Sequence, residues 1–230
     1  MESRLASVTT GITQIRQDGA SYRGRPIAPL ATSATFEEVA DLLWRADAAP
    51  TDWEPVRLPR PPRLDTGDLL RWVTVMCGAR DRLRADLRAE LVIRSARRLI
   101  STMVAALPAT SADAGAPSRG STAEGLARHL VPSGVSPAMR RELDRTLDVA
   151  LVLLADHELA TSTVAVRVAA STRADLYDAV LAGLGTLAGP LHGGASQLAY
   201  TSGWRARIGR PTPYDPLRLR PTRVDSLGCV

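Results

Sequence analysis

The sequence predicts a mainly α-helical protein, on three observations. Alanine, leucine and arginine dominate the chain, β-branched runs typical of strands are absent, and apolar residues recur at helical spacing in several segments. With 45% hydrophobic residues among 230, the chain can bury a substantial core. The longest apolar run, at 149–155, is too short to cross a bilayer, so we expect no membrane partner.

The N-terminal part predicts a short β-hairpin followed by a capped helix. Residues 8–27 have strand character around the turn dipeptide Asp18-Gly19. A helix is expected from Thr35, because Thr35 and Glu38 have the spacing of a capping box. Five prolines between residues 50 and 66 predict a loop. The expected apolar face of the first helix consists of Phe36, Val39, Leu42 and Leu43.

The middle of the chain predicts helices separated by one flexible loop. A helix is expected from Gly67, a long helical stretch from about Leu83 to Leu107, a loop over 108–121 and a short helix over 122–131. We interpret the many charges early in the long stretch as a solvated face. His129, at the end of the short helix, is expected to be exposed or to act as a local cap.

Three further helices are expected between residues 136 and 188. Ser136-Pro137 opens the first, with serine as N-cap and proline at the first helical position, and this helix is expected to reach about Glu158. The other two are expected over 162–172 and 175–188. Gly183 and Gly185 weaken the last helix and suit close helix–helix contact. The predicted core positions of these two helices are Val164, Val168, Leu176, Val180, Leu184 and Leu187.

Charge and cysteine content exclude several classes of function. The net charge is +5 and every basic residue is arginine, but the arginines are interleaved with acids, so we expect no nucleic-acid partner. Cys77 is expected to be a small buried side chain, and nothing suggests a disulfide framework or a metal site. The N-terminus lacks the apolar core of a secretory signal, so a cytoplasmic location is expected.

The most informative segment is Gly-Pro-Leu-His-Gly-Gly at 189–194. His192 follows a Gly-Pro break, and the glycines beside it permit a sharp turn and close approach of a ligand. Imidazole can donate or accept a proton near neutral pH, which suits a reaction centre. The alternative is that His192 only caps a turn. A second motif, Asp156-His157-Glu158, places His157 35 residues upstream of His192.

These motifs resemble those of the citrate synthase family. Besides D-H-E at 156–158 and G-P-L-H-G-G at 189–194, SYRGRPI at 21–27 resembles the family's Y-R-G-x-x-I turn, and TFEEVADLLW at 35–44 resembles its F-E-E-V-A-x-L-L-W helix. The resemblance covers residues 8–199 and implies the helical large domain of that fold, with an N-terminal hairpin and without the small domain. It assigns 1–200 to a partial large domain and 201–230 to an irregular Arg/Pro-rich tail, read out of frame or following a deletion.

The resemblance also implies a reaction and a set of site residues. Citrate synthases condense acetyl-CoA or another acyl-CoA with oxaloacetate to give citrate and CoA, with no cofactor beyond the acyl-CoA substrate. His192 matches the catalytic histidine that stabilises the enolate oxygen, and His157 matches the histidine that holds the oxo acid. Gly189, Gly193 and Gly194 form the supporting loop. Asp156 and Glu158 either orient His157 or face solvent.

Other parts of the family's machinery have no match. No histidine follows His192, so the family's second catalytic histidine is absent from this chain, and neither its aspartate base nor its carboxylate-binding arginines are found. We therefore expect little or no activity from the chain alone. The resemblance also implies assembly, as a homodimer or as a heterodimer with a citrate synthase paralogue. The alternatives are a non-catalytic or regulatory partner of a full-length paralogue, a helical scaffold without ligand, or a nucleic-acid binder.

Overall fold

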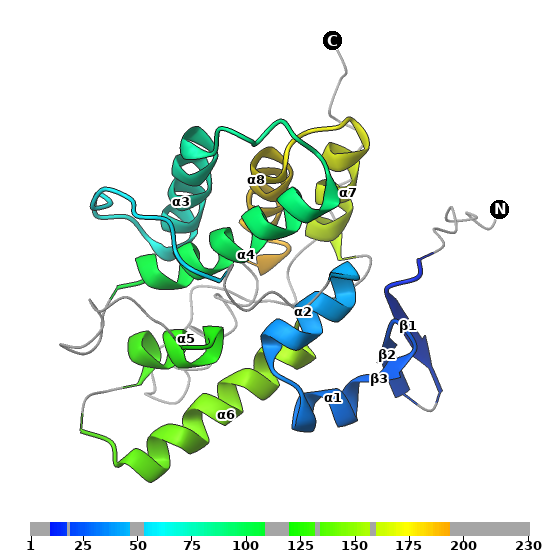
Figure 1. The fold of residues 1–230 in the computed structure, drawn as a ribbon, viewed down its shortest axis with the longest axis vertical. Helices are drawn as coiled ribbons and strands as arrows, with labels where there is room; N and C mark the ends of the chain where they lie inside the picture. The colour runs from blue at the N-terminus through cyan, green and yellow to red at the C-terminus, as the bar shows by residue number, and fades with distance from the viewer. Residues whose placement is uncertain are drawn as a thin grey trace, which may run out of the picture. The chain divides into compact units, whose positions relative to one another are not determined.

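The computed structural model describes residues 10–17, 19–46, 53–108, 120–131, 134–156 and 160–193. The chain divides into two compact units, Met1–Gly185 and Thr186–Val230. Within the described ranges lie eight helices and one small antiparallel sheet near the N-terminus (Figure 1), which confirms the predicted mainly helical fold. None of these helices is long and apolar enough to cross a membrane. The predicted boundary near residue 200 lies outside the described residues.

The predicted hairpin is present. Strands β1 (Thr13–Arg16) and β2 (Gly19–Tyr22) pair antiparallel, with Thr13 opposite Tyr22. Gly19 has a φ of 139°, a backbone conformation that side-chain-bearing residues rarely adopt, so a glycine is required where β2 begins. Asp18, the other residue of the predicted turn dipeptide, lies outside the described residues.

A third strand, β3 (Arg25–Pro26), extends the sheet beyond the prediction. It pairs antiparallel with β2 across a two-residue turn at Arg23 and Gly24, whose φ values are 47° and 81°. Positive φ at both central residues is the conformation whose twist matches paired strands. The sequence Arg-Gly is a weaker hairpin signal than Asn-Gly or Asp-Gly, which is why the pattern did not predict this strand.

The helix predicted from Thr35 is confirmed together with its cap. It is α2 (Phe36–Trp44), and it is preceded by an unpredicted short helix, α1 (Ile27–Ser33). The Glu38 N–H donates to Thr35 Oγ1 at 3.2 Å, and the Thr35 N–H donates to Glu38 Oε2 at 2.8 Å. This reciprocal pair satisfies two donors that the first helical turn would otherwise leave open.

The long helical stretch predicted from Leu83 begins later than expected. Helix α3 (Thr66–Arg80) is followed by a loop over 81–88, and α4 (Ala89–Ala106) starts only after it. The Asp81 carboxylate accepts the Leu83 N–H at 2.9 Å, and the Asp86 carboxylate accepts the Arg88 N–H at 3.2 Å. Such local side-chain bonds compete with helical ones and keep this segment in turns.

The C-terminal helices follow the prediction in number and order. The Ser136 hydroxyl accepts the Met139 N–H at 3.3 Å, which confirms the predicted N-cap, but the helix ends at Leu153 rather than near Glu158. The four elements are α5 (Thr122–Leu130), α6 (Pro137–Leu153), α7 (Thr161–Ser171) and α8 (Leu176–Leu187).

Two apolar clusters hold the first unit together. One joins the sheet, α1, α2 and the end of α6, and the other joins α3, α4 and α8. The predicted burial of Cys77 is confirmed, because its side chain is 2% exposed in the second cluster. The first consists of Tyr22, Leu30, Ala31, Val39, Leu43 and Val152, and the second of Leu69, Val73, Cys77, Leu99 and Tyr177.

The predicted core faces of α7 and α8 are wrong at three positions. Val164, Val168 and Leu187 are 42%, 61% and 42% exposed. The contact between the two helices is instead centred on Gly183, where an added Cβ would lie 2.5 Å from Val166 Cγ2. Gly183 thus confirms the expected close approach, whereas a Cβ at Gly185 would meet nothing within 4 Å.

One arginine of the predicted solvated face is buried. Arg97 in α4 is 3% exposed, and its guanidinium pairs with the Asp41 carboxylate of α2, with Nη2 2.6 Å and Nε 3.2 Å from Oδ1. A charge this deep is tolerated only with a partner, so the pair fixes α4 against α2. The interpretation of these charges as solvated is wrong at Arg97.

Candidate functional site

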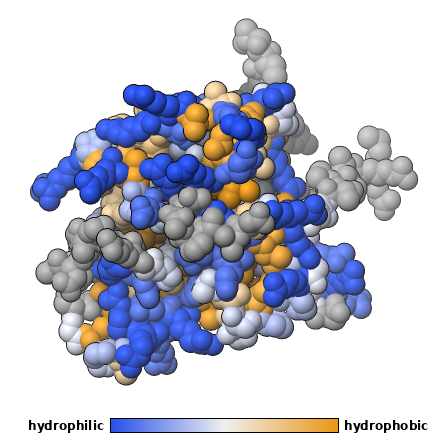
Figure 2. All heavy atoms as spheres, in the orientation of Figure 1, coloured by the Kyte–Doolittle hydropathy of each residue, from blue (hydrophilic) through white to orange (hydrophobic). Residues whose placement is uncertain are grey.

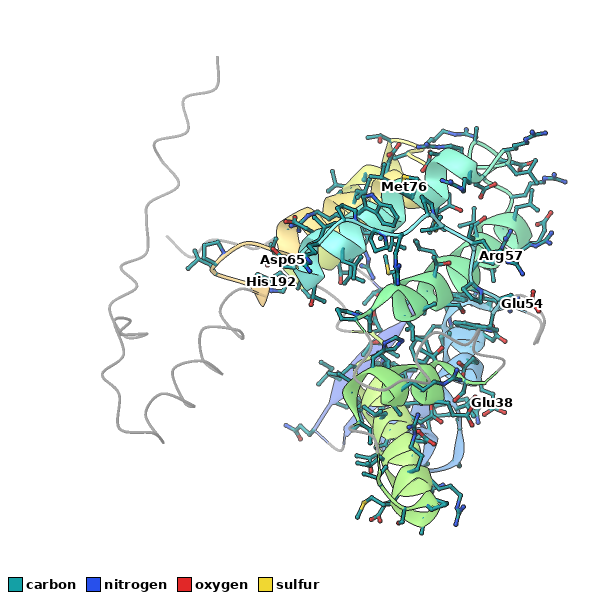
Figure 3. All side chains as sticks on the ribbon, turned by 90° about the vertical axis from the view of Figure 1, so that its left-hand side faces the viewer. Glu38, Glu54, Arg57, Asp65, Met76 and His192 are labelled. Atoms are coloured by element: carbon teal, nitrogen blue, oxygen red, sulfur yellow. The ribbon has the colours of Figure 1, made fainter. Side chains whose placement is uncertain are left out.

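The segment after α8 carries His192 in a hydrogen-bonded turn. The Gly189 N–H donates to the Thr186 carbonyl at 3.1 Å, and the His192 N–H donates to the Gly189 carbonyl at 3.0 Å. Helix α8 ends at Leu187, and Pro190 has no N–H with which the chain could resume the helix. The histidine lies in the loop at the end of α8 (Figure 3), and its side chain is half-buried. The turn therefore fixes the backbone of His192 while leaving its imidazole partly accessible.

A steric reason requires glycine immediately after this histidine. A Cβ added at Gly193 would lie 2.5 Å from the Leu187 carbonyl oxygen and 2.9 Å from Leu187 Cδ1. A Cβ at Gly189 would lie 3.2 Å from the Thr186 carbonyl. The chain thus folds back on the last turn of α8 as only glycine permits. Gly194, the third predicted loop glycine, lies outside the described residues.

The second predicted site residue, His157, also lies outside the described residues, but the residue before it is fixed. The Thr13 hydroxyl of β1 donates to the Asp156 Oδ2, and the Asp156 N–H donates to the Tyr22 hydroxyl at 3.3 Å. The Asp156 carboxylate therefore has a partner in the N-terminal sheet. The role of Asp156 in orienting His157, and the role of His157 in holding the oxo acid, remain predictions.

Tyr22 connects the sheet to the end of α6. Its side chain is fully buried, and its hydroxyl lies 3.2 Å from the Val152 carbonyl and 3.3 Å from the Leu153 carbonyl. These are among the carbonyls that the end of a helix leaves without helical partners. Burial raises the pKa of Tyr22, which keeps the hydroxyl protonated as a donor. The Y-R-G turn thus holds the chain at the point where it enters the D-H-E motif.

The contact between Tyr22 and Asp156, which joins two of the sequence motifs, was not predicted from the sequence. Tyr22 and Asp156 are separated by 134 residues, and no local pattern pairs residues so far apart. The available signal was the presence of an aromatic residue bearing a hydroxyl at the end of a predicted strand, because a buried tyrosine usually finds a polar partner.

The third histidine differs from its prediction. His129 is 7% exposed, and its Nδ1 lies 3.2 Å from the Pro108 carbonyl oxygen. The expectation of an exposed histidine is wrong, because α5 packs its His129 face inward. Among the described residues, no group of three or more histidines, cysteines or acids could hold a metal ion.

Comparison with known proteins gives one consistent family. A model described as "Citrate synthase, C-terminal domain" matches residues 3–211. A citrate synthase of Mycolicibacterium smegmatis is 29% identical over 212 residues, covering 82% of this chain and 56% of the relative. The 2-methylcitrate synthase 2 of Corynebacterium glutamicum is 30% identical over 207 residues, covering 77% of this chain and 53% of the relative.

A solved structure agrees with these sequence matches. The crystal structure of citrate synthase from Pyrobaculum aerophilum superposes with a TM-score of 0.61 at 26% identity, over 91% of this chain and 59% of that one. The chain spans about half the length of the curated relatives it matches. With most of its residues matched by the family model and its fold shared with a solved member, the chain belongs to the citrate synthase family.

Proposed function

We propose that this chain carries the large-domain part of a citrate synthase-type acyltransferase site. Acetyl-CoA, oxaloacetate and water give citrate and CoA; another acyl-CoA gives the correspondingly substituted citrate, and water cleaves the thioester in both cases. His192 is the donor to the enolate oxygen and His157 holds the oxo acid. The observation that carries the proposal is the glycine-built turn that fixes the backbone of His192 and leaves its ring partly accessible, in a chain of this family.

The chemistry explains why such a turn matters. Removing a proton from the carbon beside the thioester places negative charge on the carbonyl oxygen, and the resulting carbanion then attacks the ketone carbon of the oxo acid. A donor that is already positioned stabilises that oxygen without reorganising during the reaction. The backbone bond from His192 to Gly189, with Gly193 packed on Leu187, supports this role because both restrict where the imidazole can lie.

The proposal includes a limit on the activity of the chain itself. The family's second histidine and aspartate base have no match in the sequence, and losing members of a cooperating catalytic set costs orders of magnitude in rate. We therefore propose that residues 1–230 bind the oxo acid but turn over little or not at all by themselves. Assembly as a homodimer, or with a citrate synthase paralogue, in the cytoplasm belongs to the same proposal.

Two measurements on the purified chain test the proposal. Oxaloacetate should raise the melting temperature of the wild-type chain and of His192→Asn, but not that of His157→Ala. CoA release from acetyl-CoA and oxaloacetate should stay far below the ~10 s⁻¹ typical of enzymes. If oxaloacetate does not raise the melting temperature of the wild-type chain, the proposed oxo-acid site is wrong. If CoA is released near the typical rate, the proposed lack of activity is wrong.

A third measurement addresses the regulatory alternative. The chain is co-expressed with a full-length citrate synthase of the same family, and co-purification and the kcat of the longer chain are measured. The regulatory alternative predicts a stable complex in which the kcat of the longer chain is altered. If the His192→Asn variant of this chain alters that kcat equally, this chain acts as a regulatory partner, because the effect does not need the proposed donor.

A further inference from the structure

An open basic hollow lies in the first unit. It has a volume of about 660 Å³ and is lined by residues 82, 83 and 85–88 of the loop between α3 and α4, and by Arg173 in the turn between α7 and α8. Figure 1 shows these two connections side by side at the top of the view. The lining contains three arginines and one aspartate, a net charge of +2.

The loop that forms one side of the hollow is held in place at its base. The Asp81 carboxylate accepts hydrogen bonds from the Leu83 N–H at 2.9 Å, the Ser95 hydroxyl at 2.8 Å and the Tyr177 hydroxyl at 2.8 Å. Burial raises the pKa of Asp81, and the hydrogen bonds that the carboxylate accepts lower it by more. The pKa of Asp81 therefore lies below its ordinary value. The carboxylate stays charged and the loop is tied to both α4 and α8.

The acids next to the hollow are already engaged. Arg84 places its Nε 2.6 Å from Asp175 and its Nη2 3.2 Å from Asp178, which neutralises the carboxylates at the start of α8. Asp86 pairs with Arg88 at 2.7 Å. Little negative charge is therefore left to oppose an incoming anion.

Two arginines of the lining remain available. Neither guanidinium, at Arg82 or at Arg173, has a hydrogen-bond or ion-pair partner among the described residues. Arg173 has a φ of 65° at the end of α7, where its N–H donates to the Ala170 carbonyl at 2.9 Å. Glycine is the residue usually found in this left-handed conformation, which is unfavourable for an arginine.

The lining also offers apolar surface. Leu83 and Leu87 are 54% and 37% exposed, beside the arginines. Figure 2 shows apolar residues between strongly hydrophilic ones over this upper part of the molecule. A guanidinium pair suits the oxygens of a phosphate, and exposed leucines suit an apolar substituent on it.

We propose that this hollow binds a small phosphorylated anion that carries an apolar group, with Arg82 and Arg173 on its phosphate and Leu83 and Leu87 against its apolar part. The net charge of the lining matches the two negative charges of a phosphate monoester. The proposal does not depend on condensing activity, because neither His157 nor His192 is among the residues that line the hollow.

The test is direct binding of phenyl phosphate to the full chain by calorimetry, with inorganic phosphate for comparison. Phenyl phosphate should bind saturably and more tightly than inorganic phosphate. Arg82→Gln and Arg173→Gly should each weaken it about tenfold, the loss expected for one charge-assisted hydrogen bond. Arg173→Gly gives the clearer test, because glycine suits the left-handed backbone position and the variant should keep or gain folding stability.

The matched control is Arg141→Gln. Arg141 is exposed on α6, lies outside the hollow and has no described partner, so removing it changes the net charge equally. Phenyl phosphate affinity should be unchanged in this variant. An equal loss in all three variants would show diffuse charge attraction and overturn the site. Two other results would overturn the proposed site. One is phenyl phosphate binding that does not saturate up to about 10 mM, and the other is a DNA duplex that binds the hollow more tightly than phenyl phosphate.

Discussion

The contact between Gly183 in α8 and Val166 in α7 predicts that Gly183→Ala destabilises the protein. The same change in an open helical position normally stabilises, because alanine is a better helix former than glycine. At Gly183 the added methyl group would lie 2.5 Å from Val166 Cγ2, closer than real Cβ atoms approach other atoms. The sign of the effect therefore depends on whether steric cost exceeds helix propensity.

The magnitudes favour destabilisation. The propensity gain is about 1 kcal/mol, and overpacking costs about 1–3 kcal/mol. Val166 cannot move its methyl group easily, since a β-branched side chain in a helix has one preferred rotamer. We expect a net loss of about 1 kcal/mol in the free energy of unfolding.

Urea unfolding measures this with two internal references. Gly185→Ala, in the same helix, should stabilise by up to about 1 kcal/mol, because nothing lies within 4 Å of its new methyl group. In a Val166→Ala background the blocking methyl group is gone, so adding Gly183→Ala should become stabilising. The slope of the unfolding curve should be unchanged throughout.

One result would refute this reasoning. If Gly183→Ala stabilises the wild-type chain as much as Gly185→Ala does, the two helices are not in close contact at Gly183. A loss of stability that persists unchanged in the Val166→Ala background would place the clash elsewhere.

Two further predictions concern charged side chains with defined partners. Arg97→Met should lower the free energy of unfolding by about 3–5 kcal/mol, because it leaves the Asp41 carboxylate without its partner. The double variant Arg97→Met, Asp41→Leu should recover most of that stability. Urea unfolding that shows no recovery in the double variant contradicts the pairing. The folded-state pKa of Asp81 is lowered from its ordinary 3.8, so the stability it contributes is complete above pH 3.8 and is lost as pH falls through the folded-state pKa. Tyr177→Phe and Ser95→Ala each remove a hydrogen bond that lowers this pKa, so the unfolding free energy should fall less steeply below pH 3.8; an unchanged slope in acid titrations of both variants would exclude the role of Asp81.

Helix boundaries could be predicted where a side chain closes the first turn. Thr35 with Glu38, and Ser136 with Pro137, both mark real starts, because capping is a local interaction read from adjacent residues. Helix α1 lacks such a mark, since its N-cap Pro26 makes no side-chain bond. The segment from Leu83 carries leucines at helical spacing and was therefore predicted as helix. Its backbone N–H groups instead donate to the Asp81 and Asp86 carboxylates, which keeps the segment in turns.

The site was predictable only as far as its local motif. The glycines around His192 indicate a sharp turn from the sequence alone, and the structure gives Gly193 its steric reason in Leu187. Contacts over long separations were not predictable, because their partners carry no shared local signal. Arg97 and Asp41, 56 residues apart, are each unremarkable in their own segments until the fold buries them together.

The dependence of the first strands on the end of α6 has a consequence for biosynthesis. Tyr22 is made early, but its hydroxyl partner at Val152 follows 130 residues later. At ~5–20 residues per second, a ribosome needs on the order of 10 s to supply that partner. During this interval the Tyr22 hydroxyl lacks the helix end that accepts it, so this contact of the N-terminal sheet can form only after most of the chain has been made.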